Sequence, residues 1–264
     1  MPIITLTTDF GLEDWFVGAV KGVIWDRCSD ARVVDLTHGV PPGDVRAGAF
    51  ALMAGTRCFK HGAIHMAVVD PGVGSERSAV AIQTSLAIYV GPDNGLLSWA
   101  VDRDGGGVAR RITNSDLFLL RTSRTFHGRD VFAPVTAFLA AGGPFEAVGP
   151  LETAWQQLPW PAPVRSEAGW LGEVLYVDRF GNGITNLAED TCGEPSGGGS
   201  RRVSVRVRVG NASGVVAACY AGTPHGAAFG AVFGSTGYLE IAVPGGNAAE
   251  RLGLRAGVRV VLES

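Results

Sequence analysis

The sequence changes character near residue 150, and this change limits what the chain can fold into. Before it, short apolar runs typical of strands alternate with stretches of helical spacing; after it, strand-like runs predominate. Residues 149–163 separate the two parts and hold four prolines with no clear periodicity. We therefore predict an α/β domain over residues 1–150, a linker over 151–167 and a small all-β domain, barrel or sandwich, over 168–264.

The first 150 residues combine both kinds of element. Strands are expected at residues 3–7, 31–36, 63–69, 78–83 and 86–90, and helices at 15–25, 44–55, 96–101 and 131–141. Alternation of this kind predicts helices packed on a largely parallel central sheet.

Composition excludes several classes of function. The 264 residues are 46% hydrophobic and 18% charged, and the net charge of −3 gives no basic surface for nucleic acid. No apolar run approaches the roughly 18 residues that span a bilayer, and the start lacks a signal peptide, so we expect a cytoplasmic protein that does not bind membranes. The four cysteines form no CxxC pair and the histidines show no metal-ligand spacing, so we expect reduced thiols and no metal.

An acid and a cation follow the expected strand 63–69. Asp70 begins the turn Asp70-Pro71-Gly72, and Arg77 lies seven residues further on, where a tight turn could bring it back. The Gly72-Val73-Gly74 stretch lacks the third glycine of a dinucleotide loop. Asp70 could equally be a turn residue and Arg77 a solvated surface residue.

His127 lies between Phe126 and Gly128, in an irregular segment before the expected helix 131–141. A lone histidine is often structural. Taken with Asp70 and Arg77, however, it completes a set of acid, permanent cation and imidazole, which is enough to position and deprotonate a water molecule.

Three further sites carry polar groups in turns. Asp9 ends the first strand, where open α/β sheets bind ligands, although it could instead be a helix-capping or turn residue. Asp178 and Asn182 belong to a stretch with good hairpin-turn chemistry, and Ser235 lies in a second turn between strands. Amides suit a base edge and a carboxylate suits an ammonium or a sulfonium.

The order of the motifs resembles one family along nearly the whole chain. The sequence contains, in order, TTDFG, VVDPGVGSER, GPDNGLL, FHGRDVFAPVTA, DRFGNGITN and STGYLEIAV, followed by GNAAERLGL. In this it resembles the S-adenosyl-L-methionine hydroxide adenosyltransferases, which are related to fluorinating and chlorinating enzymes. The resemblance implies an N-terminal α/β domain, a linker, a C-terminal β-barrel, and a homotrimer with each substrate held between subunits.

The resemblance also assigns roles to single residues. Members that use water carry an aspartate, an arginine and a histidine in the motifs occupied here by Asp70, Arg77 and His127, whereas halogenating relatives have a tyrosine at the position of Asp70. By motif, Asp9 would bind the ribose hydroxyls and Asn182 the adenine.

By the same motifs, Asp178 and Ser235 would hold the methionine portion, Asp178 through its ammonium. The halogenases have an arginine just after the matching serine, where this chain has Thr236.

The implied reaction is hydrolysis of S-adenosyl-L-methionine (SAM) to adenosine and L-methionine, without a cofactor, by water attack at the ribose C5′. As a hypothesis, His127 accepts a proton, Arg77 stabilises the developing hydroxide, and Asp70 orients the water or the arginine. Two alternatives stay open: a halide-using enzyme that makes 5′-halo-5′-deoxyadenosine, and a non-catalytic protein that binds SAM or adenosine.

Overall fold

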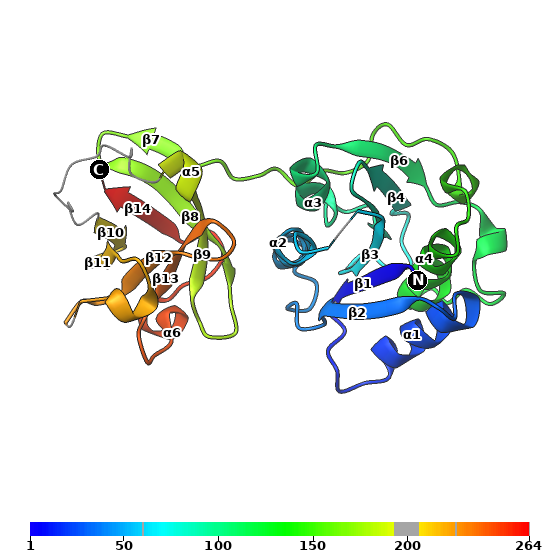
Figure 1. Ribbon diagram of the computed structural model, residues 1–264, viewed down its shortest axis with the longest axis horizontal. Coiled ribbons are helices and arrows are strands. Elements are labelled where there is room, and N and C mark those ends of the chain that lie inside the picture. Colours follow the sequence, from blue (N-terminus) through cyan, green and yellow to red (C-terminus); the bar gives the residue numbers. More distant parts are fainter. Residues whose placement is uncertain (60, 193–205, 225, 264) are drawn as a thin grey trace. The chain divides into compact units, whose positions relative to one another are not determined.

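The chain folds into two units that meet near residue 159 of the sequence. A computed structural model (Figure 1) describes residues 1–59, 61–192, 206–224 and 226–263. Contacts divide the chain into Met1–Pro159 and Trp160–Ser264. The segment 151–167 contributes to both units, because Leu151 bridges to Arg110 in the first and β7 (Val164–Ser166) is a strand of the second.

The first unit is a sheet with helices on both faces. Its strands are β1 (Ile3–Thr8), β2 (Arg32–Thr37), β3 (Ala63–Val68), β4 (Ala79–Thr84), β5 (Ala87–Pro92) and β6 (Gly107–Arg111). Its helices and helical turns are α1 (Phe16–Arg27), α2 (Val45–Thr56), α3 (Ser98–Arg103), η1 (Ser115–Leu117), η2 (Gly128–Phe132), α4 (Ala133–Ala140) and η3 (Phe145–Val148).

The sheet is mixed, so the expectation of a largely parallel sheet is not confirmed. Its order is β2-β1-β3-β5-β4-β6; the first four strands pair in parallel, and β4 is antiparallel to both β5 and β6. The reason lies in the connection, since only Ser85 and Leu86 separate β4 from β5. A two-residue loop can join only antiparallel strands, because a parallel pair needs a long crossover.

The parallel half of the sheet carries the core. Strand β3 is buried along its whole length, and its residues Ile64, Met66 and Val68 pack with α1 and α4 in one apolar cluster. Helix α2 covers the other face, beside α3 (Figure 1). It begins where the Asp44 carboxylate accepts a hydrogen bond from the Ala47 N–H at 2.9 Å, a favourable N-cap.

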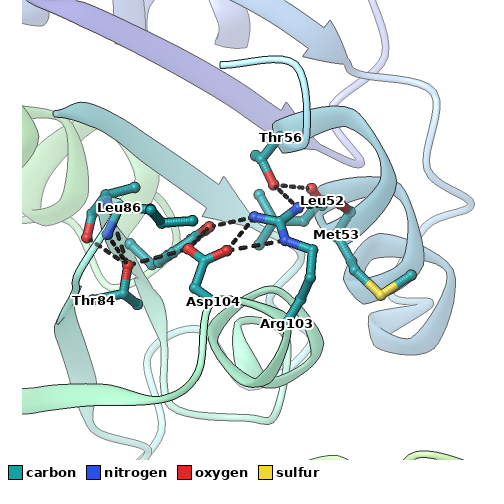
Figure 2. Close-up of polar contacts among 9 residues, drawn as sticks. Leu52, Met53, Thr56, Thr84, Leu86, Arg103 and Asp104 are labelled. Carbon is teal, nitrogen blue, oxygen red and sulfur yellow. Dashed lines mark hydrogen bonds and ion pairs between the residues drawn. The ribbon is translucent and has the colours of Figure 1, made fainter. Parts of the chain in front are cut away.

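A polar network joins α3 to α2 and to the β4–β5 hairpin (Figure 2). The guanidinium of Arg103 donates to the Asp104 carboxylate at 2.6 Å and to the Thr56 hydroxyl at 2.9 Å. The buried Asp104 carboxylate also accepts from the hydroxyls of Thr84, at 3.1 Å, and Tyr89, at 2.8 Å. Each buried polar group thus has a partner, which holds the α2–α3 layer on the sheet.

The second unit contains a closed barrel. Its strands are β7, β8 (Gly169–Val177), β9 (Gly183–Ala188), β10 (Arg206–Val209), β11 (Ala212–Val216), β12 (Gly230–Phe233), β13 (Tyr238–Ala242) and β14 (Arg259–Glu263). Short helices α5 (Glu189–Cys192), η4 (Tyr220–Gly222) and α6 (Ala248–Leu252) complete the described elements.

Within the described residues, the order β14-β10-β11-β12-β13-β9-β8 closes into seven strands through β14–β8 pairing, and β7 adds to β8. The sequence predicted an all-β domain that is either a barrel or a sandwich. The structure shows that it is a barrel.

Candidate active site

Asp70 and Arg77 meet through the turn that follows β3. Gly74 has φ +79°, which L side chains rarely adopt, and a Cβ there would overlap the carbonyl oxygen of Arg124. The turn brings Arg77 back, so its Nε donates to Asp70 Oδ1 at 2.8 Å and its Nη2 to Asp70 Oδ2. Both side chains are at least nine-tenths buried. This paired geometry is the strong form of an arginine–carboxylate interaction.

His127 completes the cluster from another part of the chain. It directly precedes the π-helical turn η2, and its Nδ1 lies 3.1 Å from Arg77 Nη2. A guanidinium can only donate hydrogen bonds, so Nδ1 accepts and the neutral ring carries its proton on Nε2. The lone pair of Nδ1 is therefore occupied, and it becomes free to take a proton only when Arg77 withdraws.

The surroundings keep the imidazole of His127 neutral at neutral pH. Burial lowers its pKa below the ordinary value, and the Arg77 cation lowers it further, against the opposing effect of Asp70 and Asp130. Arg77 is also held by the ring of Phe132, with its guanidinium carbon 5.2 Å from the ring centre. The cluster thus consists of one ion pair and one neutral ring.

Asp9 lies in the same hollow as this cluster. A space of about 120 Å³ is lined by Asp9, Gly43, Asp70, Phe126 and His127, among other residues. One carboxylate oxygen of Asp9, Oδ2, accepts from the Gly43 N–H at 2.8 Å. The space is several times the roughly 30 Å³ that one water occupies in the liquid, so it can hold a water beside part of a larger molecule.

A second hollow, of about 250 Å³, lies at the opposite end of the sheet beside the β4–β5 loop. None of its lining residues is ionisable; they include Gln83, Thr84 and Ser85. We therefore place the chemistry in the smaller hollow.

The remaining expected site residues belong to the second unit. Asp178 Oδ1 accepts from the N–H groups of Phe180, at 2.9 Å, and Asn182, at 2.8 Å, and Asp178 Oδ2 accepts from the Asn182 side chain at 3.0 Å. Asp178 and Asn182 are thus brought together in one turn, as their hairpin chemistry allows. Ser235 is exposed in the turn between β12 and β13.

The sequence reasoning did not single out Glu240, in β13. Its carboxyl group is buried and accepts a hydrogen bond from the Tyr220 hydroxyl. Burial raises the pKa of Glu240 above its ordinary value, and burial with this hydrogen bond raises the pKa of Tyr220 to about 12. The available signal was an acid inside the apolar run 239–243.

The described residues form neither a metal centre nor a membrane-spanning helix. The part of the chain that the structure describes holds no group of three His, Cys, Asp or Glu side chains arranged to hold a metal ion. Nor is any helix in those residues long and apolar enough to cross a membrane.

Comparison with protein-family models matches both parts of the chain. Residues 4–149 match the SAM hydroxide adenosyltransferase N-terminal domain, and residues 172–261 match the C-terminal domain of the same name.

Similar proteins agree with these matches. The chain is 43% identical to an (R)-S-adenosyl-L-methionine hydrolase of Salinispora arenicola, over 97% of this chain and 95% of that protein. The identity is also 43% to the protein of the same name from Thermus thermophilus, over 97% of each. A fluorinase of Actinopolyspora mzabensis is 29% identical over 72% of each chain.

Among solved structures, an uncharacterized conserved protein from Thermotoga maritima has a TM-score of 0.89 and 36% identity, covering 98% of this chain and 99% of that one.

Proposed function

Because the chain belongs to the SAM hydroxide adenosyltransferase family, we propose that it is an enzyme that hydrolyses S-adenosyl-L-methionine to adenosine and L-methionine. The observation that carries the proposal is the contact of Arg77 with both Asp70 and His127, two residues that line one hollow together with Asp9. Relatives at 43% identity over nearly the full chain carry the name of a SAM hydrolase.

The reaction needs one correctly placed water. In the proposed step the water oxygen attacks the ribose C5′, the C5′–S bond breaks, and its electron pair returns to sulfur as the neutral thioether of methionine. His127 donates from Nε2 to the water oxygen, and Asp70 accepts the proton that the water loses. Asp70 Oδ1 accepts one hydrogen bond from Arg77 and keeps a second lone pair for this purpose. The sulfonium leaves readily, so no cofactor is required.

The charges of the hollow favour water over halide. Arg77 is the cation in contact with His127, and Asp70 already compensates its charge at hydrogen-bond distance. A halide would have to lose its hydration where the Arg77 charge is already compensated by Asp70, so it would gain no uncompensated cation in exchange. Water carries no charge and needs no such cation.

Substrate binding is assigned by motif. We propose that Asp9 accepts hydrogen bonds from the ribose hydroxyls and that Asn182 contacts adenine. Asp178 and Ser235 would hold the methionine portion. Asp178 Oδ2 accepts one hydrogen bond within its turn and keeps a lone pair for the substrate ammonium. The family resemblance further supports a homotrimer with sites between subunits, and light scattering tests the trimer. We also propose a cytoplasmic location, as expected from the sequence.

The name of the relatives also suggests which form of SAM is used. Since the prefix L already fixes the α-carbon, the (R) prefix refers to the sulfonium sulfur, which is a stereocentre. We propose that the (R) epimer at sulfur is a substrate of this chain. Separate incubation with each epimer, followed by chromatography of adenosine, tests this assignment; turnover of the other epimer alone would overturn it.

Isotope labelling tests the reaction itself. Incubation with SAM in ¹⁸O-labelled water should give adenosine with the label in its 5′-hydroxyl, because the attacking oxygen comes from water. Unlabelled adenosine, or a 5′-halo-5′-deoxyadenosine when chloride or fluoride is supplied, would refute the proposal. Tight binding of SAM with no product after hours would instead indicate a binding protein.

A further inference from the structure

A chain of polar contacts runs from the buried Thr8, next to Asp9, through the buried His38 to Asp35 and Lys21 nearer the surface. Thr8 is the last residue of β1, and its Oγ1 lies 2.8 Å from Nδ1 of His38, just beyond β2. His38 Nε2 lies 3.0 Å from Asp35 Oδ1, and Lys21 Nζ donates to Asp35 Oδ2 at 2.6 Å. The His38–Asp35 contact lies within ion-pair distance.

The sheet register explains how His38 reaches this place. Strands β1 and β2 pair Leu6 with Asp35 but Thr7 with Thr37, so β2 has one extra residue, Leu36, at this point. Such a bulge re-aims the residues that follow it. Here it accompanies the approach of His38 to the end of β1.

Each contact from Asp35 through His38 to Thr8 can be assigned one donor and one acceptor. The negative charge of Asp35 favours the proton on Nε2 of His38, which leaves Nδ1 to accept from the Thr8 hydroxyl. The Thr8 oxygen then keeps its lone pairs and accepts the Phe10 N–H at 3.2 Å.

The backbone of His38 adds another tie, because its carbonyl accepts from the Gly11 N–H at 2.9 Å. The segment on both sides of Asp9 is therefore bound to His38, directly or through Thr8.

We propose that Thr8 and His38 are positioning residues for Asp9, and that they fix its carboxylate where the ribose hydroxyls of the substrate bind. The inference rests on the proposed function, since it takes Asp9 as the ribose ligand. Thr8 is 1% and His38 5% exposed, so neither touches a ligand. They act by orienting Asp9, whose Oδ2 is held by Gly43 and whose Oδ1 accepts no hydrogen bond from the described residues.

The chain offers a matched control in the same strand. Thr5 of β1 is fully buried, and its Oγ1 lies 2.8 Å from Nδ1 of His65, so it repeats the threonine–histidine contact away from Asp9. Thr5→Val and Thr8→Val each remove one buried hydroxyl at nearly constant volume. Both should lower the melting temperature, but only Thr8→Val should change recognition of the ribose.

The experiment measures dissociation constants for adenosine and 2′-deoxyadenosine by calorimetry, together with KM and kcat for SAM. Thr8→Val should weaken adenosine binding about fivefold, the value of one hydrogen bond of about 1 kcal/mol, and 2′-deoxyadenosine binding less than twofold. It should raise KM by a similar factor with kcat nearly unchanged. Thr8→Ser should restore adenosine binding, and His38→Gln, which cannot reach Thr8 in the same way, should resemble Thr8→Val.

Each result decides the matter. Equal losses for the two nucleosides, or an equal effect of Thr5→Val, would show a structural role alone and overturn the inference. If Thr8→Val does not fold, the same two nucleosides measured with His38→Gln and Thr8→Ser give the decision. Absence of SAM turnover by the unaltered protein, with normal adenosine discrimination, would refute the proposed function and leave the positioning of Asp9 supported.

Discussion

Protonation of His65 should make the fold sensitive to acid. His65 is 2% exposed in β3, and burial lowers its pKa from 6.5 to about 4, with the nearby Arg103 cation adding to the effect and Asp104 opposing it. Unfolded chains bind the proton near pH 6.5, whereas the folded chain resists it until about pH 4. The contribution of His65 to the free energy of unfolding is therefore fully present above pH 6.5 and is lost as the pH drops toward 4.

The size of this loss of stability follows from the difference between the pKa values of His65 in the unfolded and folded chains. At about 1.4 kcal/mol for each pH unit, the loss is about 2 kcal/mol at pH 5 and about 3 kcal/mol well below pH 4. The perturbation is His65→Asn, whose amide can keep the contact with Thr5 but cannot titrate. Urea unfolding of both proteins at pH 7.5, 6 and 5 gives the difference in their free energies of unfolding.

The wild type should lose about 2 kcal/mol relative to His65→Asn between pH 7.5 and pH 5. Other titrating groups are shared by the two proteins and cancel in this difference. A constant difference across the three pH values would show that His65 is not held neutral by the fold, and the reasoning from its burial would fail.

Three further outcomes are expected at the candidate site. The kcat/KM for SAM should be flat above neutral pH and fall on the acid side with an apparent pKa below 6.5, because protonated His127 loses its contact with Arg77; an acid limb centred above pH 7 would contradict this. Arg77→Lys should lower kcat about 100-fold at unchanged adenosine affinity, as an ammonium cannot pair with both Asp70 oxygens; similar kcat values would count against the cluster. His127→Gln, which can still donate to water, should retain at least tenfold more activity than His127→Ala, whereas equal losses would favour His127 as the base.

Much of this architecture could be predicted from local sequence patterns. Asp70 and Arg77 are seven residues apart across a turn with glycines, so their approach follows from short-range geometry. The approach of His127 depends on the path of the chain over fifty residues, which spacing alone does not determine. The motif order supplied that information.

Other features depended on contacts that a linear pattern does not contain. The antiparallel direction of β4 could have been read from its two-residue loop, but the strand alternation concealed it. The contact of Thr8 with His38 depends on a bulge in β2. The burial of Glu240 depends on the residues that pack over β13, among them Tyr220. These follow from tertiary packing, which sequence periodicity constrains only weakly.

The charge balance of the hollow has a consequence for product release. Asp70 and Arg77 neutralise each other and His127 is uncharged, which leaves Asp9 as the net negative group among them. In the proposed site SAM enters with a positive sulfonium, and neither adenosine nor the thioether of methionine retains that charge. The electrostatic attraction therefore ends with the reaction: the hollow attracts the positively charged SAM but does not attract the products, adenosine and methionine, in the same way.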